Sequence, residues 1–197
     1  RRYAEGPELL AKALASVPGD ALQWRPAPGK WSAHEVIIHC ADSETNSHMR
    51  IRYLVGETDP TIVGYDQDRW AATMDYHAHP IAPALATVAA VRANTVPLLR
   101  RMTAEQWGRR GRHTESGSYG AEEWLKIYAE HLEIHVRQIE RNLEAWRKRP
   151  ACCTSRTNPS ATAAAAAVYV HCGPIASQAA PLASAPTNPP KPNAADR

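Results

Sequence analysis

The sequence predicts an all-α protein: a four-helix bundle with a long crossover between the second and third helices, followed by a disordered C-terminal tail. Two observations carry this prediction. Apolar residues recur at helical spacing through most of residues 1–149, and no alternating pattern typical of strands competes with them. From Pro150 onward the composition changes to 14 Ala and 8 Pro in 48 residues, with only four charged side chains.

The first two helices have clear ends. A stripe of apolar residues predicts a first helix that stops at Pro18 and Gly19. Ser32-x-x-Glu35 has the form of a capping box, which predicts that a second helix opens there and runs to about Val55. The stripe of the first helix consists of Leu9, Leu10, Ala13, Leu14 and Val17.

The second half of the domain follows the same pattern. The segment Gly56–Tyr65 breaks the second helix, and a third helical region covers roughly Asp66–Met102, in two pieces divided near Pro80. A loop over 108–120 holds four glycines, and a last helix runs from about Ala121 to Arg147. Four long helical regions with a sizeable connection between the second and third indicate a bundle with a crossover.

The two parts of the chain are predicted to differ in order. Residues 1–149 are long enough to bury one core. In residues 150–197 the prolines remove backbone donors and prevent a sustained helix, so we expect a disordered Ala/Pro-rich tail.

Composition narrows the function classes. The net charge is +3, of which +2 falls in residues 150–197, so residues 1–149 have no basic surplus for a nucleic-acid partner. Apolar residues make up 44% and charged residues 22% of the sequence. The mainly apolar run Ala161–Val170 has half the ~20 residues that a transmembrane helix needs, so we expect no membrane partner. The four cysteines form no CxxC pair, which favours a reducing, cytoplasmic location.

Three of the nine histidines are predicted to meet inside the bundle. His131 and His135 are four residues apart, about 40° on a helical wheel, on the side of the last helix that carries Trp124, Ile127 and Ile134. His39 faces inward from the second helix, close to a stripe of mostly apolar and small residues. We expect the four other histidines of the helices and the connector, namely His34, His48, His77 and His79, at the surface.

Buried imidazoles need partners, and one divalent metal ion satisfies several at once. Two ligands from one helix and a third from a facing helix would leave positions open to water or substrate, as in a catalytic site. The alternative is that the three histidines are ordinary core residues. Leu132 follows His131 where a zinc protease would carry glutamate, so the HExxH motif is excluded.

Several separated motifs resemble the DinB/YfiT-like family of metal-binding four-helix proteins, over roughly Tyr3 to Trp146. They are Trp24-Arg-Pro-Ala-Pro-Gly-Lys-Trp-Ser, His39-Cys-Ala-Asp-Ser-Glu44, Gly64-Tyr-Asp-Gln-Asp-Arg-Trp70 and the terminal His131-x-x-x-His135. The resemblance implies a bundle with a long crossover and one divalent metal ion, Zn or Ni before Fe or Mn, bound by His39, His131 and His135. The tail has no counterpart in the family.

The resemblance implies more than one activity. Better-understood members are thiol-dependent S-transferases and isomerases that act with low-molecular-weight thiols, and others are named metal-dependent hydrolases. A three-histidine ion lowers the pKa of a water or a thiol, so the ligands do not discriminate between these reactions. We expect an S-transferase that acts on a small electrophile. The alternatives are a metal-dependent hydrolase, a non-catalytic binding protein of the stress response, and a purely structural bundle; a homodimer is compatible with all of them.

Two charged residues lie near the predicted buried faces. Glu44 is a candidate catalytic residue, against the plainer interpretation of a half-exposed helix carboxylate. Arg92 falls on the apolar stripe of its helix, where it would bind an anionic substrate or pair with a buried acid such as Glu44. Cys40 lies about 100° from His39 and is expected to fill the core. The segment Arg109–Arg112 is expected in a solvated loop, with phosphate binding as the alternative. His113 beside it is expected there too, with the mouth of a pocket as its alternative.

Overall fold

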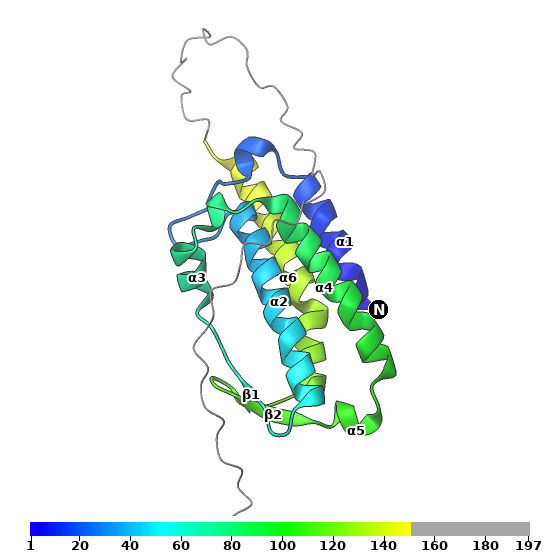
Figure 1. Cartoon of the computed structure of the whole chain (residues 1–197). Helices are drawn as coiled ribbons and strands as arrows, with labels where there is room; N and C mark the ends of the chain where they lie inside the picture. Colours follow the sequence, from blue (N-terminus) through cyan, green and yellow to red (C-terminus); the bar gives the residue numbers. More distant parts are fainter. Residues whose placement is uncertain (151–197) are drawn as a thin grey trace, which may run out of the picture. The chain divides into compact units, whose positions relative to one another are not determined.

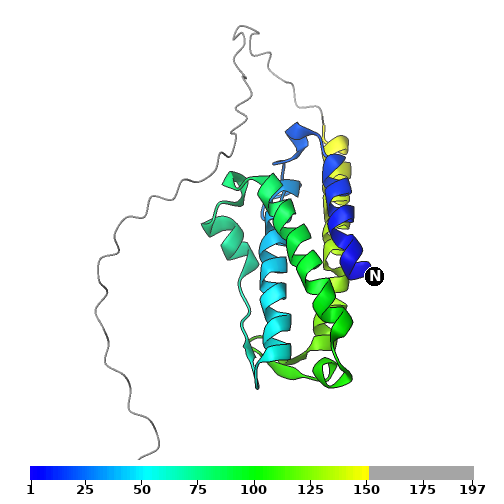
Figure 2. The ribbon, with the colours of Figure 1, turned by 45° about the vertical axis from the view of Figure 1, so that its right-hand side comes forward.

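The computed structural model describes residues 1–150, which form a four-helix bundle with a crossover, as the sequence predicts. The four long helices are α1 (Arg2–Ala15), α2 (Ala33–Gly56), α4 (Ile81–Arg101) and α6 (Ala121–Lys148). Helices α1 and α2 each pack against both α4 and α6 (Figures 1 and 2). The predicted tail lies outside the described residues, apart from Pro150, and so do Cys152, Cys153 and Cys172.

The crossover from α2 to α4 contains β1 (Thr61–Ile62), α3 (Gln67–Thr73) and a 3₁₀ turn (Tyr76–Ala78). Asp66 caps α3, because its carboxylate accepts a hydrogen bond from the Arg69 backbone N–H at 2.9 Å. Pro80 precedes the first residue of α4, which confirms the predicted division of the third helical region. Figure 2 shows the crossover on the outer side of α2, away from α1.

The capping box predicted at the start of α2 is present in both directions. The Ser32 hydroxyl accepts a hydrogen bond from the Glu35 N–H at 3.2 Å, and the Glu35 carboxylate accepts one from the Ser32 N–H at 2.9 Å. Helix α1 begins at Arg2, earlier than the apolar stripe that starts at Leu9. A 3₁₀ turn, Gly19–Ala21, lies between α1 and α2.

The predicted fold class is confirmed, but the loop expected over residues 108–120 contains two short strands. After the short helix α5 (Ala104–Trp107), the glycine-rich loop forms a hairpin of β2 (Arg110–His113) and β3 (Gly117–Gly120), and β1 adds parallel to β2. This small sheet covers the end of the bundle where α2 stops and α6 begins (Figure 1). Strands of two and four residues are too short for the alternation of apolar and polar residues to be recognised in the sequence. Gly111 of β2 is needed because the Pro60 backbone occupies the space that a Cβ would fill.

The core consists of two apolar clusters separated by a polar layer. One cluster includes Leu10, Val36, Val88 and Ile139, and the other includes Tyr3, Ile51, Leu54 and Trp124. The residues between them on α2 and α4 are polar, yet all are buried: Ser43, Glu44, Ser47, Arg92 and Thr95. This polar layer crosses the bundle at the height of the histidines.

Helix α4 is the one helix of residues 1–150 that is long and apolar enough to cross a membrane by length and composition. A helix of a water-soluble bundle passes the same test. In the structure α4 packs on α2 and α1, and the buried side that it turns to them carries Arg92. These observations account for α4 as a helix of the bundle.

Candidate metal centre

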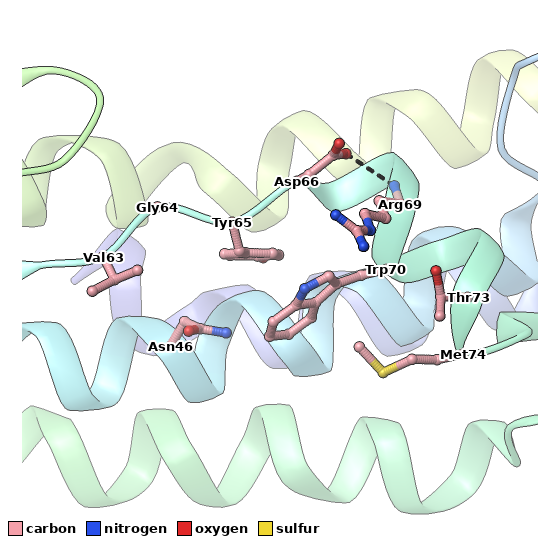
Figure 3. Close-up of a pocket in the computed structure, with 9 residues that line it drawn as sticks. All are labelled: Asn46, Val63, Gly64, Tyr65, Asp66, Arg69, Trp70, Thr73 and Met74. Atoms are coloured by element: carbon pink, nitrogen blue, oxygen red, sulfur yellow. Dashed lines mark hydrogen bonds between the residues drawn. The ribbon is translucent and has the colours of Figure 1, made fainter.

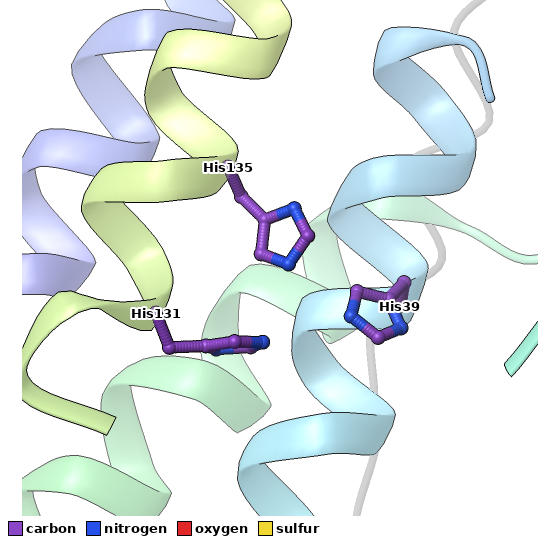
Figure 4. A group of neighbouring side chains, drawn as sticks. All are labelled: His39, His131 and His135. Atoms are coloured by element: carbon purple, nitrogen blue, oxygen red, sulfur yellow. The ribbon is translucent and has the colours of Figure 1, made fainter. Parts of the chain in front are cut away.

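The side chains of His39, His131 and His135 converge between α2 and α6 (Figure 4). Each offers a ring nitrogen, and these three atoms lie within 4.8 Å of one another. The ring centroids are 4.6 Å apart for His131 and His135, 4.8 Å for His39 and His135, and 5.6 Å for His39 and His131. The structure thus brings together the three residues that the sequence singles out.

Local helix geometry explains how α6 presents two of these rings. One turn of helix separates His131 from His135, so the side chains lie one above the other. The buried stripe of α6 runs through Trp124, Tyr128, Leu132, Ile139 and Leu143. Trp124 is buried as expected, but the expectation is wrong at Ile127 and Ile134, because both of those side chains are exposed. His131 lies on the flank of the true stripe, and its side chain is 13% exposed.

Two of the rings have a hydrogen-bond acceptor beside Nδ1, which favours the tautomer that carries the proton on this nitrogen. The His131 Nδ1 lies 3.1 Å from the Glu44 carboxylate, and the His135 Nδ1 lies 2.9 Å from the Gln138 side-chain oxygen. A proton on Nδ1 places the lone pair of each ring on Nε2, the nitrogen that would bind a metal. Partners of this kind fix the tautomer and the direction of metal-binding histidines.

The ring of His39 is buried and one of its nitrogens has no hydrogen-bond partner within residues 1–150. It is 1% exposed, its Nδ1 atom has no hydrogen-bond partner among the described residues, and the Trp31 ring packs on it at 4.7 Å. Burial, with smaller contributions from His135 and His131, lowers the pKa of His39 to about 2. Burial and His131 also lower the pKa of His135 to about 4. Both rings are therefore neutral at pH 7, the form that binds a metal.

The residues fit a divalent ion of the first transition row. The donor set is three imidazole nitrogens, which suit Zn, Ni, Cu or Fe. The buried Nδ1 of His39 has no hydrogen-bond partner within residues 1–150. The donor set accordingly agrees with the ligands expected from the resemblance and leaves the identity of the metal open.

Glu44 differs from the expected half-exposed carboxylate. It is 0% exposed, and its oxygens accept hydrogen bonds from Arg92 Nε at 2.9 Å and Nη2 at 2.7 Å as well as contacting His131. Burial acts to raise the pKa of Glu44, but the hydrogen bonds from His131 and Arg92 outweigh it and bring the pKa below its usual value. Both oxygens are engaged behind His131, so the structure places Glu44 as a positioning residue and not beside a reacting atom.

Arg92 forms the internal ion pair that was the alternative to substrate binding. Its guanidinium is 1% exposed, and besides Glu44 it donates to the backbone oxygens of Tyr3 at 2.6 Å and Tyr128 at 2.8 Å. Gly6 of α1 leaves room for this group, since a Cβ at that position would lie 2.5 Å from Arg92 Nη1. The expectation that Arg92 contacts substrate is replaced by this buried ion pair.

The histidines expected at the surface are only partly there. His34 is 6% exposed, because the connector folds over the start of α2 and His34 Nε2 contacts the His79 carbonyl at 2.8 Å. His77 is half-buried and its Nε2 lies 2.8 Å from the Ser32 hydroxyl. His48 is also half-buried, and only His79 is exposed. No pattern in the sequence of α2 predicts that the connector around His79 covers its first turn.

Cys40 and the arginine-rich segment have structural surroundings. Cys40 is fully buried in an apolar cluster, and burial raises the pKa of its thiol, so it fills the core as expected. Arg109 donates to the Val55 carbonyl and Arg110 pairs with Glu123 at 2.8 Å. His113 is buried at the end of β2 and not in a solvated loop.

Three residues near the centre lay outside the predicted site. Gln138 follows His135 by three residues, a spacing that places it on the same helix face and could have indicated it. Ser43 was part of the buried stripe of α2, and its hydroxyl lies 3.2 Å from His131 Nε2. Tyr65 comes from the crossover, whose path over α2 no local pattern predicts.

The fold and the centre together define a four-helix protein with a three-histidine cluster of the metal-binding type. The chain belongs to the DinB superfamily, whose profile matches residues 2–139. This confirms the resemblance drawn from the sequence motifs.

Relatives and a solved structure agree with this assignment. A protein of Oceanobacillus iheyensis named "Putative metal-dependent hydrolase" is 32% identical over 133 residues, 68% of this chain and 77% of its own. One of the same name from Halalkalibacterium halodurans is 27% identical over 113 residues, 57% of this chain and 66% of its own. YfiT from Bacillus subtilis, described as "a probable metal-dependent hydrolase with an unusual four-helix bundle topology", matches with a TM-score of 0.69 and 25% identity, over 74% of this chain and 84% of that one.

Proposed function

We propose that the protein is a metal-dependent hydrolase of a small molecule, with one divalent ion held by His39, His131 and His135. The observation that carries the proposal is the convergence of three imidazoles within 4.8 Å, with no carboxylate among them. The names of the relatives favour hydrolysis over the thiol transfer expected from the sequence, because the proteins compared above are named for hydrolysis.

The residues of the chain divide the work at such a site. An ion held there would supply Lewis acidity toward a carbonyl or phosphoryl oxygen and would lower the pKa of a water molecule. Glu44 and Gln138 hold His131 and His135 with their Nε2 atoms toward the centre. Trp31 covers His39 and keeps bulk water from that ring. The partial exposure of His131 leaves a way in for a small ligand.

Metal analysis of the purified protein tests the site. We expect about one ion per chain in the wild type. The metal affinity of His39→Ala and His131→Ala should fall by more than the 10–100-fold that is typical when a residue supporting a ligand is removed. The matched control is His48→Ala, a half-buried histidine of α2 that contacts Thr95 and not the centre. A wild type without stoichiometric metal, or a His131→Ala variant that keeps it, would refute the proposal.

The reaction is tested with the metal-loaded protein on chromogenic carboxylic esters, amides and phosphate esters. Turnover should disappear with a chelator, return when the metal is added back, and be absent from His131→Ala. A parallel panel of small thiols with an electrophile measures the alternative. Turnover that requires a thiol, with none on the ester and amide panels, would replace the hydrolase by an S-transferase.

A further inference from the structure

Tyr65 reaches from the crossover toward α2 and lines a pocket of about 550 Å³ (Figure 3). It precedes α3, and its ring lies against the Trp70 ring with the centroids 4.3 Å apart. Asn46 of α2 and Met74, just after α3, line other parts of the same pocket. The walls of the pocket therefore combine two aromatic rings, a thioether and an amide.

The Tyr65 hydroxyl is a buried hydrogen-bond donor without a partner among the described residues. Leaving such a group unpaired costs its desolvation without the return of a hydrogen bond, so a native structure usually supplies a partner. Burial raises the pKa of Tyr65 to about 12, a rise that the neighbouring Ser43 hydroxyl reduces. The phenol therefore keeps its proton at pH 7 and can donate it in a hydrogen bond.

Ser43 connects this hydroxyl with the histidines. Its Oγ lies 3.2 Å from His131 Nε2, the nitrogen that faces the centre, and it is also a neighbour of the Tyr65 hydroxyl. His39, Ser43 and Asn46 follow one another at intervals of four and three residues, within about 60° on α2. At 1.5 Å per residue, Asn46 lies about 10 Å along α2 from His39. Ser43 thus lies between the Tyr65 hydroxyl and His131, and Asn46 of the pocket lies on the same face of α2 as His39 and Ser43.

We propose that Tyr65 is a substrate-binding residue of the histidine centre, whose hydroxyl donates a hydrogen bond to an oxygen of the ligand held there. This inference rests on the proposed function, because it takes the ligand to sit at the ion of that site. The ligand class is a small molecule with a carbonyl or phosphoryl oxygen at the reacting end. Its apolar remainder lies in the pocket against Tyr65 and Trp70.

Two phenols of this chain make a matched pair for the test. The hydroxyl of Tyr3, like that of Tyr65, is buried and has no hydrogen-bond partner among the described residues. Tyr3 packs instead on Trp124 at 5.4 Å, in the apolar cluster at the other side of the polar layer. Tyr65→Phe and Tyr3→Phe each remove one oxygen that has no hydrogen-bond partner within residues 1–150, so neither should lower the melting temperature.

The experiment titrates the Co²⁺-loaded full chain with acetohydroxamate, a small metal-binding carbonyl compound, and follows the visible absorption and the heat of binding. We expect Tyr65→Phe to bind the probe about threefold to tenfold more weakly, the value of one hydrogen bond. Tyr3→Phe should match the wild type. The Co²⁺ content should be equal in all three proteins.

The outcomes separate this inference from the proposed function. Equal dissociation constants for the wild type and Tyr65→Phe, an equal loss in Tyr3→Phe, or no binding of the probe by the Co²⁺ form would overturn the role of Tyr65 and leave the metal site intact. A wild type that takes up no Co²⁺ would overturn the metal site, and the role of Tyr65 with it.

Discussion

The carboxylate of Glu44 serves two purposes, and the substitution Glu44→Gln separates them. It pairs with Arg92 through two hydrogen bonds, and it accepts a third contact from His131. The amide keeps the shape and can still accept from His131, but it removes the negative charge. Arg92 then stays buried without a counter-ion.

The magnitude follows from that burial. Removing one partner of a buried ion pair costs about 3–5 kcal/mol, because the other charge is left uncompensated. The side chains are 0% and 1% exposed, so no discount for solvent screening applies. For a domain of this size each kcal/mol shifts the melting temperature by about 2–4 °C, and we expect a fall of roughly 6–20 °C. Urea unfolding of the metal-free protein measures the free energy directly.

A double variant distinguishes the ion pair from the support of His131. In Glu44→Leu with Arg92→Met both charges are gone, and an apolar pair of similar volume is often as stable as the ion pair it replaces. Stability should therefore recover, while His131 still lacks its acceptor and metal affinity should stay about 10–100-fold reduced. The reasoning is refuted if Glu44→Gln unfolds like the wild type, or if the double variant regains full metal affinity.

Three further predictions follow from the same contacts. Gly6→Ala should destabilise the protein by about 1–3 kcal/mol in urea, because a Cβ there meets the Arg92 guanidinium, whereas Gly56→Ala, with open space around it, should not. Gln138→Leu should weaken metal binding about 10–100-fold with the melting temperature of the metal-free protein unchanged, since only the hydrogen bond to His135 is lost. In the metal-free protein the free energy of unfolding should fall as the pH drops below about 6.5, because the lowered pKa values of His39 and His135 mean that the unfolded chain takes up protons first; His39→Phe should make this pH dependence shallower.

The helices could be predicted because their signals are local. The capping box at Ser32 and Glu35 and the break at Pro80 each depend on neighbouring residues, and both appear in the structure where the sequence puts them. The convergence of His39 with His131 could also be inferred, since each helix has a face and a bundle has one interior. Two periodic patterns were enough to bring together residues 92 positions apart.

What could not be predicted depends on contacts between distant segments. His34 is buried because the connector around His79 folds onto it, and the crossover adds β1 to the hairpin of β2 and β3 through hydrogen bonds of Pro60 and Ile62. The predicted stripe of α6 was wrong at Ile127 and Ile134, because both are apolar yet exposed. Hydrophobicity indicates which residues can be buried, but the neighbouring helices decide which ones are.

The polar layer explains why the centre needs more than three histidines. An apolar pair at the positions of Glu44 and Arg92 would hold the bundle together about as well as the ion pair does, so stability alone does not account for two buried charges. Orientation does. A neutral imidazole can carry its proton on either nitrogen, and only an acceptor fixed behind Nδ1 keeps the lone pair of His131 Nε2 toward the centre. Arg92 in turn keeps that acceptor ionised and in place, through contacts with Tyr3 of α1 and Tyr128 of α6. The direction of His131 Nε2 is thus set by all four long helices of the bundle.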